Sequence, residues 1–348
     1  MSRIQIDGRV VGEGQPVFIV AEMSANHGKD FDTAAKIIEA AAKAGAEAIK
    51  LQTYTPDTMT IRCDNSFFRI KGTVWEGEVL YDLYERAYTP WDWQPRLKSL
   101  ANGLGLRLFS TPFDHTAVDF LEDMGVPCYK VASFELVDLE LISRVAQTGK
   151  PLILSTGMAT LEEIEEAVQT AREAGANQIA LLKCTSAYPA PAQEINLRAM
   201  PHLAETFGVA VGLSDHTLGI AVPVAAVALG ACIIEKHLTL SRSMPGPDSA
   251  FSLEPQEFRS MVEAVRTAER ALGSVRYGVT ETESPSRVFR RSLFVVQDVE
   301  SGQLFTEENV RSIRPGHGLR PKHLRDVLGR RAAADIAAGT PLAWNLVS

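Results

Sequence analysis

The feature that most constrains the fold of this chain is a repeated alternation of strand-like and helix-like segments. Short apolar runs rich in β-branched residues each precede a segment with helical periodicity, and eight such pairs occupy about 270 residues. The expected strands are 17–22, 47–52, 106–111, 127–132, 151–155, 178–184, 209–214 and 231–237. The expected helices are 32–44, 91–103, 115–124, 138–148, 161–174, 196–207, 218–229 and 255–272. Eight pairs predict a (β/α)8 TIM barrel of the α/β class.

Both ends of the chain depart from this repeat. Residues 3–16 hold three glycines and a proline among short apolar runs, which predicts a hairpin that plugs the base of the barrel. After the eighth helix the sequence GVTETESPSR is polar and predicts a linker. We therefore expect a barrel domain at 1–275, a linker at 276–287 and a small β domain at 288–348.

The small domain contains two segments that resemble each other. DVESGQLFTEENV begins at Asp298 and DIAAGTPLAWNLV begins at Asp335. One duplication is too short for a solenoid, so it predicts a compact pseudo-symmetric β module. A unit of about 60 residues is marginally stable alone, and we expect it to dock on another surface.

Side-chain alternation along the expected strands turns polar residues toward the barrel interior. In the strand EAIKLQT, Lys50 and Gln52 share the inward face, because every second residue of a strand points the same way. The same rule turns inward Glu22, Lys130, Ser214, His216, Glu235 and His237. Lys183 has the opposite parity to its polar neighbours, so we exclude it from the site.

Two histidines end neighbouring strands. His216 follows the seventh expected strand in VGLSDHT, and His237 ends the eighth in IEKHL. Chemistry in a β/α barrel collects at the carboxyl ends of the strands, so this pair predicts a divalent-metal site. The alternative is that each imidazole ends its strand and hydrogen-bonds a backbone carbonyl.

Two inward lysines, Lys50 and Lys130, predict an anion site. Hydroxyls lie at the ends of the third, fourth, fifth and seventh expected strands, at Thr111, Ser133, Ser155 and Ser214. Ammonium and hydroxyl groups together suit a phosphate or carboxylate. A buried lysine can instead form a Schiff base, but two lysines with four hydroxyls favour the anion site.

Four carboxylates lie near the same edge and have no unique role from sequence. They are Glu22, Glu135, Glu235 and Asp248. Each is a candidate general acid or base, and each can equally pair with a lysine. Glu235 is also a candidate to orient His216 or His237.

Two further features have open interpretations. The connection 53–88 is long and contains Phe67, Phe68 and Trp75, which predicts a substrate lid, unless it is an insertion without function. Arg314 lies on a Pro-Gly turn in the small domain, where an arginine is usually solvated unless that domain covers an active site.

Composition narrows the partners and the compartment. The net charge of -8 argues against nucleic acid or an anionic membrane as a partner. The four cysteines show no C-x-x-C spacing and indicate buried thiols in a reducing compartment. No apolar run is long enough for a transmembrane helix, and the charged start MSRIQIDGRV is unlike a signal peptide. We expect a cytoplasmic protein.

Nine ordered blocks of sequence resemble the sialic acid synthase (nonulosonic acid synthase) family. The blocks are AEMSANH, IKLQTYTPD, STPFD, YKVASFE, LSTGMAT, KCTSAYP, VGLSDHT, IEKHLT and GPDSAFSL. The resemblance covers essentially the whole chain, and the tail is similar to the antifreeze-like (SAF, β-clip) domain of these enzymes. It implies condensation of phosphoenolpyruvate with an N-acylated amino-sugar aldehyde, giving a nine-carbon nonulosonic acid and phosphate.

The resemblance also implies roles for individual residues. His216 and His237 would bind one divalent metal, Mn²⁺ or Mg²⁺, and Glu22 or Glu235 would move a proton. The residues implied for phosphoenolpyruvate are Lys50, Thr111, Lys130, Ser133, Ser155, Ser186 and Ser214. Those implied for the sugar are Glu22, Gln52, Glu135, Tyr188, Asp248 and Arg314. Ser186 departs from the family pattern, because an asparagine commonly stands there in sialic acid synthases proper.

The family resemblance further implies a domain-swapped homodimer, in which the small domain of one subunit brings Arg314 to the barrel of its partner. The sugar itself stays open. We expect 2,4-diacetamido-2,4,6-trideoxy-L-altrose, and the alternatives are N-acetylmannosamine or a legionaminate-pathway sugar. A non-catalytic binding protein is the alternative of another class, although it has no need of two inward lysines and two inward histidines.

Overall fold

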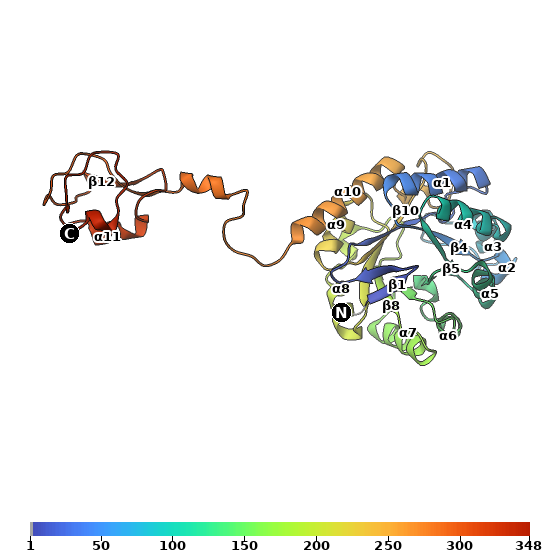
Figure 1. Ribbon diagram of the computed structural model, residues 1–348. Helices are drawn as coiled ribbons and strands as arrows, with labels where there is room; N and C mark the ends of the chain where they lie inside the picture. The colour runs from blue at the N-terminus through green and yellow to red at the C-terminus, as the bar shows by residue number, and fades with distance from the viewer. Residues whose placement is uncertain (1–2) are drawn as a thin grey trace. The chain divides into compact units, whose positions relative to one another are not determined.

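Eight parallel strands close into a barrel in the computed structural model, which describes residues 3–348 (Figure 1). The order around the barrel is β10-β3-β4-β5-β6-β7-β8-β9. The strands are β3 (Phe18–Glu22), β4 (Ala48–Thr53), β5 (Arg107–Pro112), β6 (Tyr129–Val131), β7 (Leu152–Ser155), β8 (Ile179–Cys184), β9 (Ala210–Asp215) and β10 (Ile233–His237). The predicted (β/α)8 barrel is confirmed.

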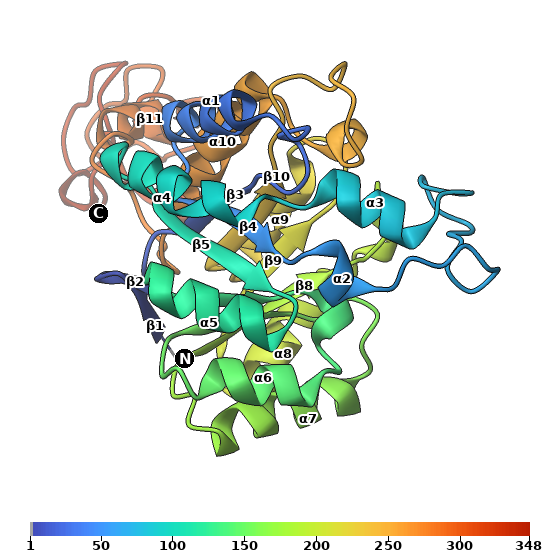
Figure 2. The ribbon, with the colours of Figure 1, turned by 90° about the vertical axis from the view of Figure 1, so that its right-hand side faces the viewer.

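Helices surround the barrel wall (Figure 2). They are α1 (Phe31–Ala44), α4 (Gln94–Gly103), α5 (His115–Met124), α6 (Leu139–Ala146), α7 (Leu161–Glu173), α8 (Ala199–Phe207), α9 (Ala221–Ala228) and α10 (Pro255–Leu272). Their starts are chemically defined: Asp30 accepts a hydrogen bond from the backbone of α1, and Thr160 and Glu163 form a capping box on α7. Short 3-10 helices occur at η1 (Trp91–Trp93), η2 (Ser133–Glu135), η3 (Ala192–Glu194), η4 (Ser249–Phe251), η5 (Ser284–Phe289), η6 (Pro321–His323) and η7 (Trp344–Leu346).

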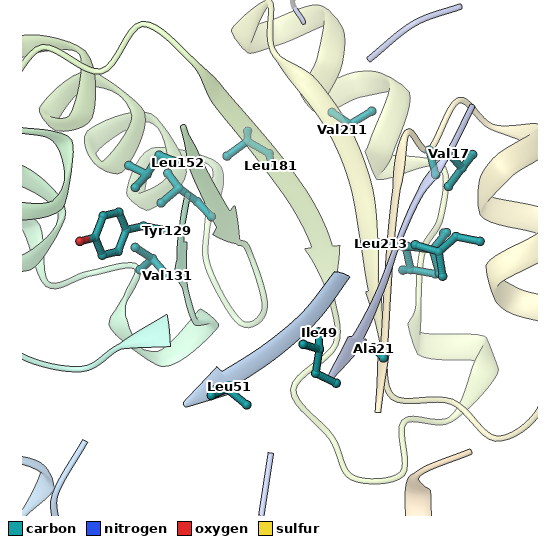
Figure 3. Close-up of a cluster of buried hydrophobic side chains, with 14 of the residues drawn as sticks. Val17, Ala21, Ile49, Leu51, Tyr129, Val131, Leu152, Leu181, Val211 and Leu213 are labelled. Carbon is teal, nitrogen blue, oxygen red and sulfur yellow. The ribbon is translucent and has the colours of Figure 1, made fainter. Parts of the chain in front are cut away.

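The strands separate two hydrophobic cores, as their alternation requires. Ile49, Leu51 and Leu213 point to the helices and belong to the outer core drawn in Figure 3. Ala48 and Phe109 belong instead to a smaller core inside the barrel. The polar residues of the same inward faces continue this interior toward the carboxyl ends of the strands.

An N-terminal hairpin contributes to the inner core. β1 (Arg3–Ile6) and β2 (Arg9–Gly12) pair antiparallel, and Ile4, Ile6 and Val11 are buried with the inward residues of the barrel. The predicted plug at the base of the barrel is confirmed, because apolar side chains fill the barrel end opposite the polar one.

The connection between β4 and η1 contains two helices that the sequence analysis did not separate. They are α2 (Pro56–Met59) and α3 (Leu80–Ala87). A helix of eight residues spans only about two turns, so its periodicity is weak evidence in sequence. In the structure α3 buries Tyr81 and Leu83, which fixes one face of the connection.

A second compact unit spans Ser274–Ser348, and the first unit ends at Gly273. It contains β11 (Ser292–Val295), β12 (Val310–Ile313) and α11 (Leu324–Val327) around its own apolar core. The expected pseudo-symmetry is present in its hydrogen bonds. The Asp335 carboxylate accepts from the backbone N–H of Ser301 at 2.7 Å, and the Asp298 carboxylate accepts from that of Ala338 at 2.8 Å.

The expected burial is found for three of the four cysteines. All four are free thiols; Cys128, Cys184 and Cys232 are buried, whereas Cys63 is only partly buried. Within residues 3–348, no helix combines the length and the apolar character needed to cross a membrane.

Candidate active site

A cavity of about 430 Å³ opens at the carboxyl ends of the barrel strands. Most residues expected in the site line it: Lys50, Gln52, Lys130, Ser133, Glu135, Ser155, Tyr188, Ser214, His216, Glu235, His237 and Asp248. Glu22 and Thr111 contact Lys50 beside it. Lys183 bonds the backbone oxygen of Cys184 and is not among the lining residues. Arg314 belongs to the second unit, where it follows β12.

Two lysines and two glutamates form a buried quartet at the floor of this cavity. Lys50 Nζ lies 2.6 Å from Glu22 Oε2 and 3.4 Å from Glu235 Oε1, and Lys130 Nζ lies 3.6 Å from Glu235 Oε1. Strand register creates the first contact, since Glu22 and Lys50 are direct partners in the β3–β4 pair. Ser214 donates to Glu235 at 3.0 Å. The quartet has two positive and two negative groups, so its formal charge balances.

The two carboxylates of the quartet differ in acidity. Burial raises the pKa of Glu22 to about 7, against the opposing effect of Lys50. Burial alone would also raise the pKa of Glu235, but Lys130 and Lys50 outweigh it, and the pKa is lowered. Glu235 therefore stays ionised between the lysines, while Glu22 exchanges a proton near neutral pH.

Hydroxyl groups gather around Gly157, which sequence reasoning did not single out. Ser133 Oγ accepts a hydrogen bond from the Gly157 N–H at 3.1 Å. A Cβ at Gly157 would lie 2.3 Å from Ser186 Oγ and 2.7 Å from Ser133 Oγ, so only glycine leaves this space open. Ser155 Oγ is buried and has no partner within residues 3–348. The arrangement offers an anion the hydroxyls of Ser155 and Ser186, which have no partner among the described residues, while the Gly157 N–H already donates to Ser133. In the sequence, the glycine in LSTGMAT, directly after a strand end, was the feature that could have indicated this position.

The two histidines meet as expected from their strand ends. Their ring centroids are 5.3 Å apart. His216 Nδ1 lies 2.9 Å from the Thr185 carbonyl oxygen, which accepts a hydrogen bond from it, so Nε2 carries the lone pair whenever the ring is neutral. His237 Nδ1 is buried without a hydrogen-bond partner in the described chain. Burial lowers the pKa of His237 well below its usual value, with His216 and Lys50 adding to the effect, so this imidazole is neutral.

Cys184 is a site residue that the sequence analysis treated only as a buried thiol. It ends β8, lines the cavity and lies with Sγ 3.8 Å from His216 Nδ1. Burial would raise its pKa, but His216 and Lys130 outweigh burial and lower the pKa to about 7. Its strand parity, which equals that of Ser186 and Tyr188, was the available signal.

A second polar group faces the cavity from the β3 and β10 loops. Gln52 Nε2 donates to Ser24 Oγ at 3.0 Å, and Ser24 in turn donates to the Asp248 carboxylate. Ser24 was missed because it lies in the loop after β3, where strand parity does not apply. Across the cavity, Glu135 Oε2 is buried without a partner among residues 3–348, and burial raises the pKa of Glu135 to about 7.

An apolar wall covers another side of the cavity. Its residues come from the 53–88 connection and are Met59, Ile70, Trp75, Leu80, Leu83 and Ala87. Trp75 Nε1 donates to the Pro247 carbonyl at 3.1 Å, and its ring lies 5.6 Å from that of Tyr188. Of the aromatic residues expected there, Trp75 lines the cavity and Phe67 is exposed. The connection thus borders the site as expected.

The metal-ligand chemistry of the site is limited to the histidine pair. Residues 3–348 contain no group of three or more His, Cys, Asp or Glu side chains arranged to hold a metal ion. His237 is neutral. Burial would lower the pKa of His216, but Cys184 outweighs burial and raises it, so His216 must lose its proton before Nε2 can bind a metal. The pair then fits a divalent cation whose remaining ligands come from substrate or water.

Comparison with known families identifies both units. Residues 37–277 match the NeuB family, and residues 290–348 match the SAF domain. The pseudaminic acid synthase of Helicobacter pylori is 46% identical over 329 residues, which cover 94% of this chain and 97% of that protein. The N,N'-diacetyllegionaminic acid synthase of Legionella pneumophila is 37% identical over 339 residues, covering 96% and 95%.

A solved structure supports the same relationship. The N-acetylneuraminic acid synthetase of Leptospira borgpetersenii serovar Hardjo-bovis, crystallised in complex with citrate, superposes with a TM-score of 0.73. It is 32% identical, and the match covers 82% of this chain and 95% of that one.

Proposed function

The chain belongs to the NeuB family and ends in a SAF domain, and from this premise we propose that it acts as a pseudaminic acid synthase. The reaction joins phosphoenolpyruvate, 2,4-diacetamido-2,4,6-trideoxy-L-altrose and water, and it yields pseudaminic acid and phosphate. The observation that carries the proposal is a single cavity whose floor holds paired lysines, whose side holds two imidazoles and whose wall is apolar.

Phosphoenolpyruvate is assigned to the floor. Lys50 and Lys130 would bind its anionic groups, with hydroxyls from Thr111, Ser133, Ser155, Ser186 and Ser214. Because Glu22 and Glu235 already neutralise the lysines, the incoming anion shares these cations with the carboxylates. The Gly157 N–H donates to Ser133 Oγ and so holds this hydroxyl in place.

A divalent metal, Mn²⁺ or Mg²⁺, is assigned to His216 and His237. The fit rests on His216 Nε2, whose lone pair is free once the ring is neutral, and on His237 Nδ1, which is buried without a partner among the described residues. When bound there, the ion would act as a Lewis acid toward the sugar aldehyde. The hydrogen bond from His216 to the Thr185 carbonyl holds the ring in one tautomer and orientation.

The residues of the chain then serve the following steps. C3 of phosphoenolpyruvate attacks the aldehyde carbon, so a C–C bond forms, the carbonyl π bond breaks to give an alkoxide, and C2 becomes electron-poor. Water adds at C2 and loses a proton to a carboxylate, and the alkoxide takes up a proton. The C2–O bond to phosphate then breaks, phosphate leaves, and the C2 hydroxyl becomes the ketone with loss of its proton. Glu22 and Glu235 both contact Lys50 at the floor, and either is placed to accept the proton that water loses. Lys50 and Lys130 stabilise the departing phosphate.

The apolar wall favours a deoxy sugar. The altrose derivative carries a C6 methyl and two acetamido methyls, whereas N-acetylmannosamine carries one acetamido methyl and a hydroxymethyl group. A wall that includes Ile70, Leu80 and Leu83 gains burial of methyl groups and would leave a hydroxyl unpaired. Gln52, Glu135, Tyr188 and Asp248 would bind the polar groups of the sugar.

The proposed role of the SAF domain is to complete the active site of a second subunit. We propose a domain-swapped homodimer in which Arg314 reaches the sugar bound in the partner barrel. The charges support this, since an arginine on the Pro315-Gly316 turn would meet a cavity edged by Glu135 and Asp248. The free thiols support a reducing, cytoplasmic location.

The test is phosphate release from phosphoenolpyruvate with Mn²⁺ and three sugars offered separately. These are the altrose derivative, its legionaminate-pathway counterpart and N-acetylmannosamine. Turnover with the altrose derivative alone is expected. Preference for another sugar would keep the chemistry and reassign the substrate, and no turnover by folded, metal-supplied protein would indicate a binding protein instead.

A further inference from the structure

A buried ion pair lies directly behind the histidines and takes no part in the cavity. Lys236 Nζ lies 2.5 Å from Asp215 Oδ2, and neither side chain is exposed to solvent. The two residues are direct partners in the β9–β10 register. Their strand neighbours Ser214 and Glu235 line the cavity, so alternation turns Asp215 and Lys236 to the opposite, helix-facing side of the barrel wall.

Both residues of this pair are hydrogen-bonded to Thr217, the residue after His216. Thr217 donates to Asp215 through its N–H at 3.0 Å and through Oγ1 at 3.0 Å. Lys236 Nζ also donates to the Thr217 carbonyl. Asp215 and Thr217 flank His216 in sequence, and Lys236 precedes His237. The Lys236 ammonium therefore binds the residues on both sides of His216, and Lys236 itself lies on β10, the strand that ends in His237.

Burying the Lys236–Asp215 ion pair costs desolvation free energy, which apolar side chains at the same place would not require. Removing two charges from water is expensive, and well-packed apolar residues often stabilise a protein as much as a buried ion pair does. The surrounding outer core is apolar and includes Leu213 and Ile234. Stability alone therefore does not explain the pair, whereas a need to hold two backbone segments in one geometry does.

We propose that Lys236, Asp215 and Thr217 form a clamp that positions His216 and His237 for divalent-metal binding. The clamp sets the backbone of both ligands, and the Thr185 carbonyl sets the His216 ring. The clamp residues are positioning residues because they act through the histidines. This inference rests on the metal assignment of the proposed function.

The test compares Mn²⁺ affinity in the full chain, measured from the free-ion electron paramagnetic resonance signal. The variant Lys236→Met with Asp215→Asn removes both charges together and keeps an amide oxygen for the Thr217 N–H. Mn²⁺ binding is expected to weaken by about 10- to 100-fold, the usual effect of losing outer-shell support. Phosphoenolpyruvate binding measured in EDTA should not change, and excess Mn²⁺ should restore most of kcat.

The matched control is Lys150→Met with Glu122→Gln. This pair is also separated by 2.5 Å, but neither residue lines the cavity. Its Mn²⁺ affinity should equal that of the unaltered protein. If the clamp variant does not fold, Thr217→Val replaces it, because it removes only the Oγ1 bond and should weaken Mn²⁺ roughly 2- to 10-fold.

The outcomes separate the two ideas. Unchanged Mn²⁺ affinity in a folded clamp variant would overturn the clamp and leave the histidine site intact. No Mn²⁺ binding by the unaltered, folded protein would overturn the metal assignment itself. An equal loss in the Lys150 control would also reject the clamp, since the effect would then be general.

Discussion

The ammonium of Lys50 lies 2.6 Å from the carboxylate of Glu22, and both side chains are buried at the floor of the cavity. The contact follows from strand register, because these residues face each other across β3 and β4. It means that a cation placed to bind substrate is neutralised before substrate arrives. Phosphoenolpyruvate therefore has to compete with the carboxylates for the lysines. Lys130 is the less tightly paired of the two, because its ammonium lies 3.6 Å from Glu235.

Lys130→Met is expected to raise the KM for phosphoenolpyruvate by about 10- to 150-fold, because a charged hydrogen bond contributes about 1.5–3 kcal/mol. Steady-state kinetics with a saturating sugar would measure it. Lys183→Met is the matched control, since Lys183 also lies on a barrel strand, β8, but its ammonium donates to a backbone carbonyl. Similar KM values for the two variants would reject the anion site.

Glu135→Gln is expected to stabilise the protein at pH 8. Burial raises the pKa of Glu135 from 4.5 to about 7, so the folded state keeps a proton that the unfolded state has lost between these values. The free energy of unfolding therefore falls as pH rises from 4.5 to 7, and the amide should recover about 1–3 kcal/mol above pH 7. Melting temperatures at pH 4 and pH 8 measure this effect. Glu166→Gln on the exposed face of α7 should show no such gain, and a destabilised Glu135→Gln at pH 8 would contradict the assignment.

His27 should make the fold sensitive to acid. Burial lowers its pKa to about 4, with Lys29 adding to the effect, and its Nδ1 accepts a hydrogen bond from the Lys29 N–H. The contribution of neutral His27 is complete above pH 6.5 and is lost as pH falls toward 4, by up to about 3 kcal/mol. Denaturant unfolding at pH 5 and pH 7 should show a smaller difference in His27→Gln. The exposed His202→Gln should keep the original difference, and an unchanged pH dependence in His27→Gln would refute the prediction.

Trp75→Phe is expected to raise the KM for the sugar by about 2- to 10-fold and to leave the KM for phosphoenolpyruvate unchanged. The indole N–H bond to the Pro247 carbonyl connects the apolar wall to the loop that carries Asp248. Trp91→Phe is the control, because Trp91 makes the same kind of bond to a backbone carbonyl, that of Tyr54, but does not itself line the cavity. Loss of activity in both variants alike would point to a general packing effect.

Arg314→Ala should be rescued by a partner subunit if the SAF domain acts in trans. Mixing Arg314→Ala with Lys130→Met chains should regenerate one complete site in each heterodimer. At a phosphoenolpyruvate concentration well below the raised KM of Lys130→Met, random pairing should give about a quarter of the original activity. Activity of the refolded mixture, with heterodimers verified by differential tags, measures it. Verified heterodimers without recovered activity would reject the swapped arrangement.

Much of the fold follows from the order of residues alone. Eight strand-helix pairs required a closed barrel, and side-chain alternation assigned Lys50 to the interior and Lys183 to the outer face. These conclusions depend only on the period of a strand and on the carboxyl ends of parallel strands meeting at one edge. Residues such as Lys50 and His237 were accessible to sequence analysis for that reason.

Distances across the barrel were decided by the tertiary structure. The sequence determined which face Glu22, Cys184 and Asp215 occupy, but not that they pair with Lys50, His216 and Lys236. Such contacts depend on strand register and stagger around the closed sheet, which a single strand does not encode. Loop residues such as Ser24 and Gly157 follow no period at all. The sequence by itself therefore determined the barrel and the direction of its polar side chains, and only the closure of the barrel decided which of them meet.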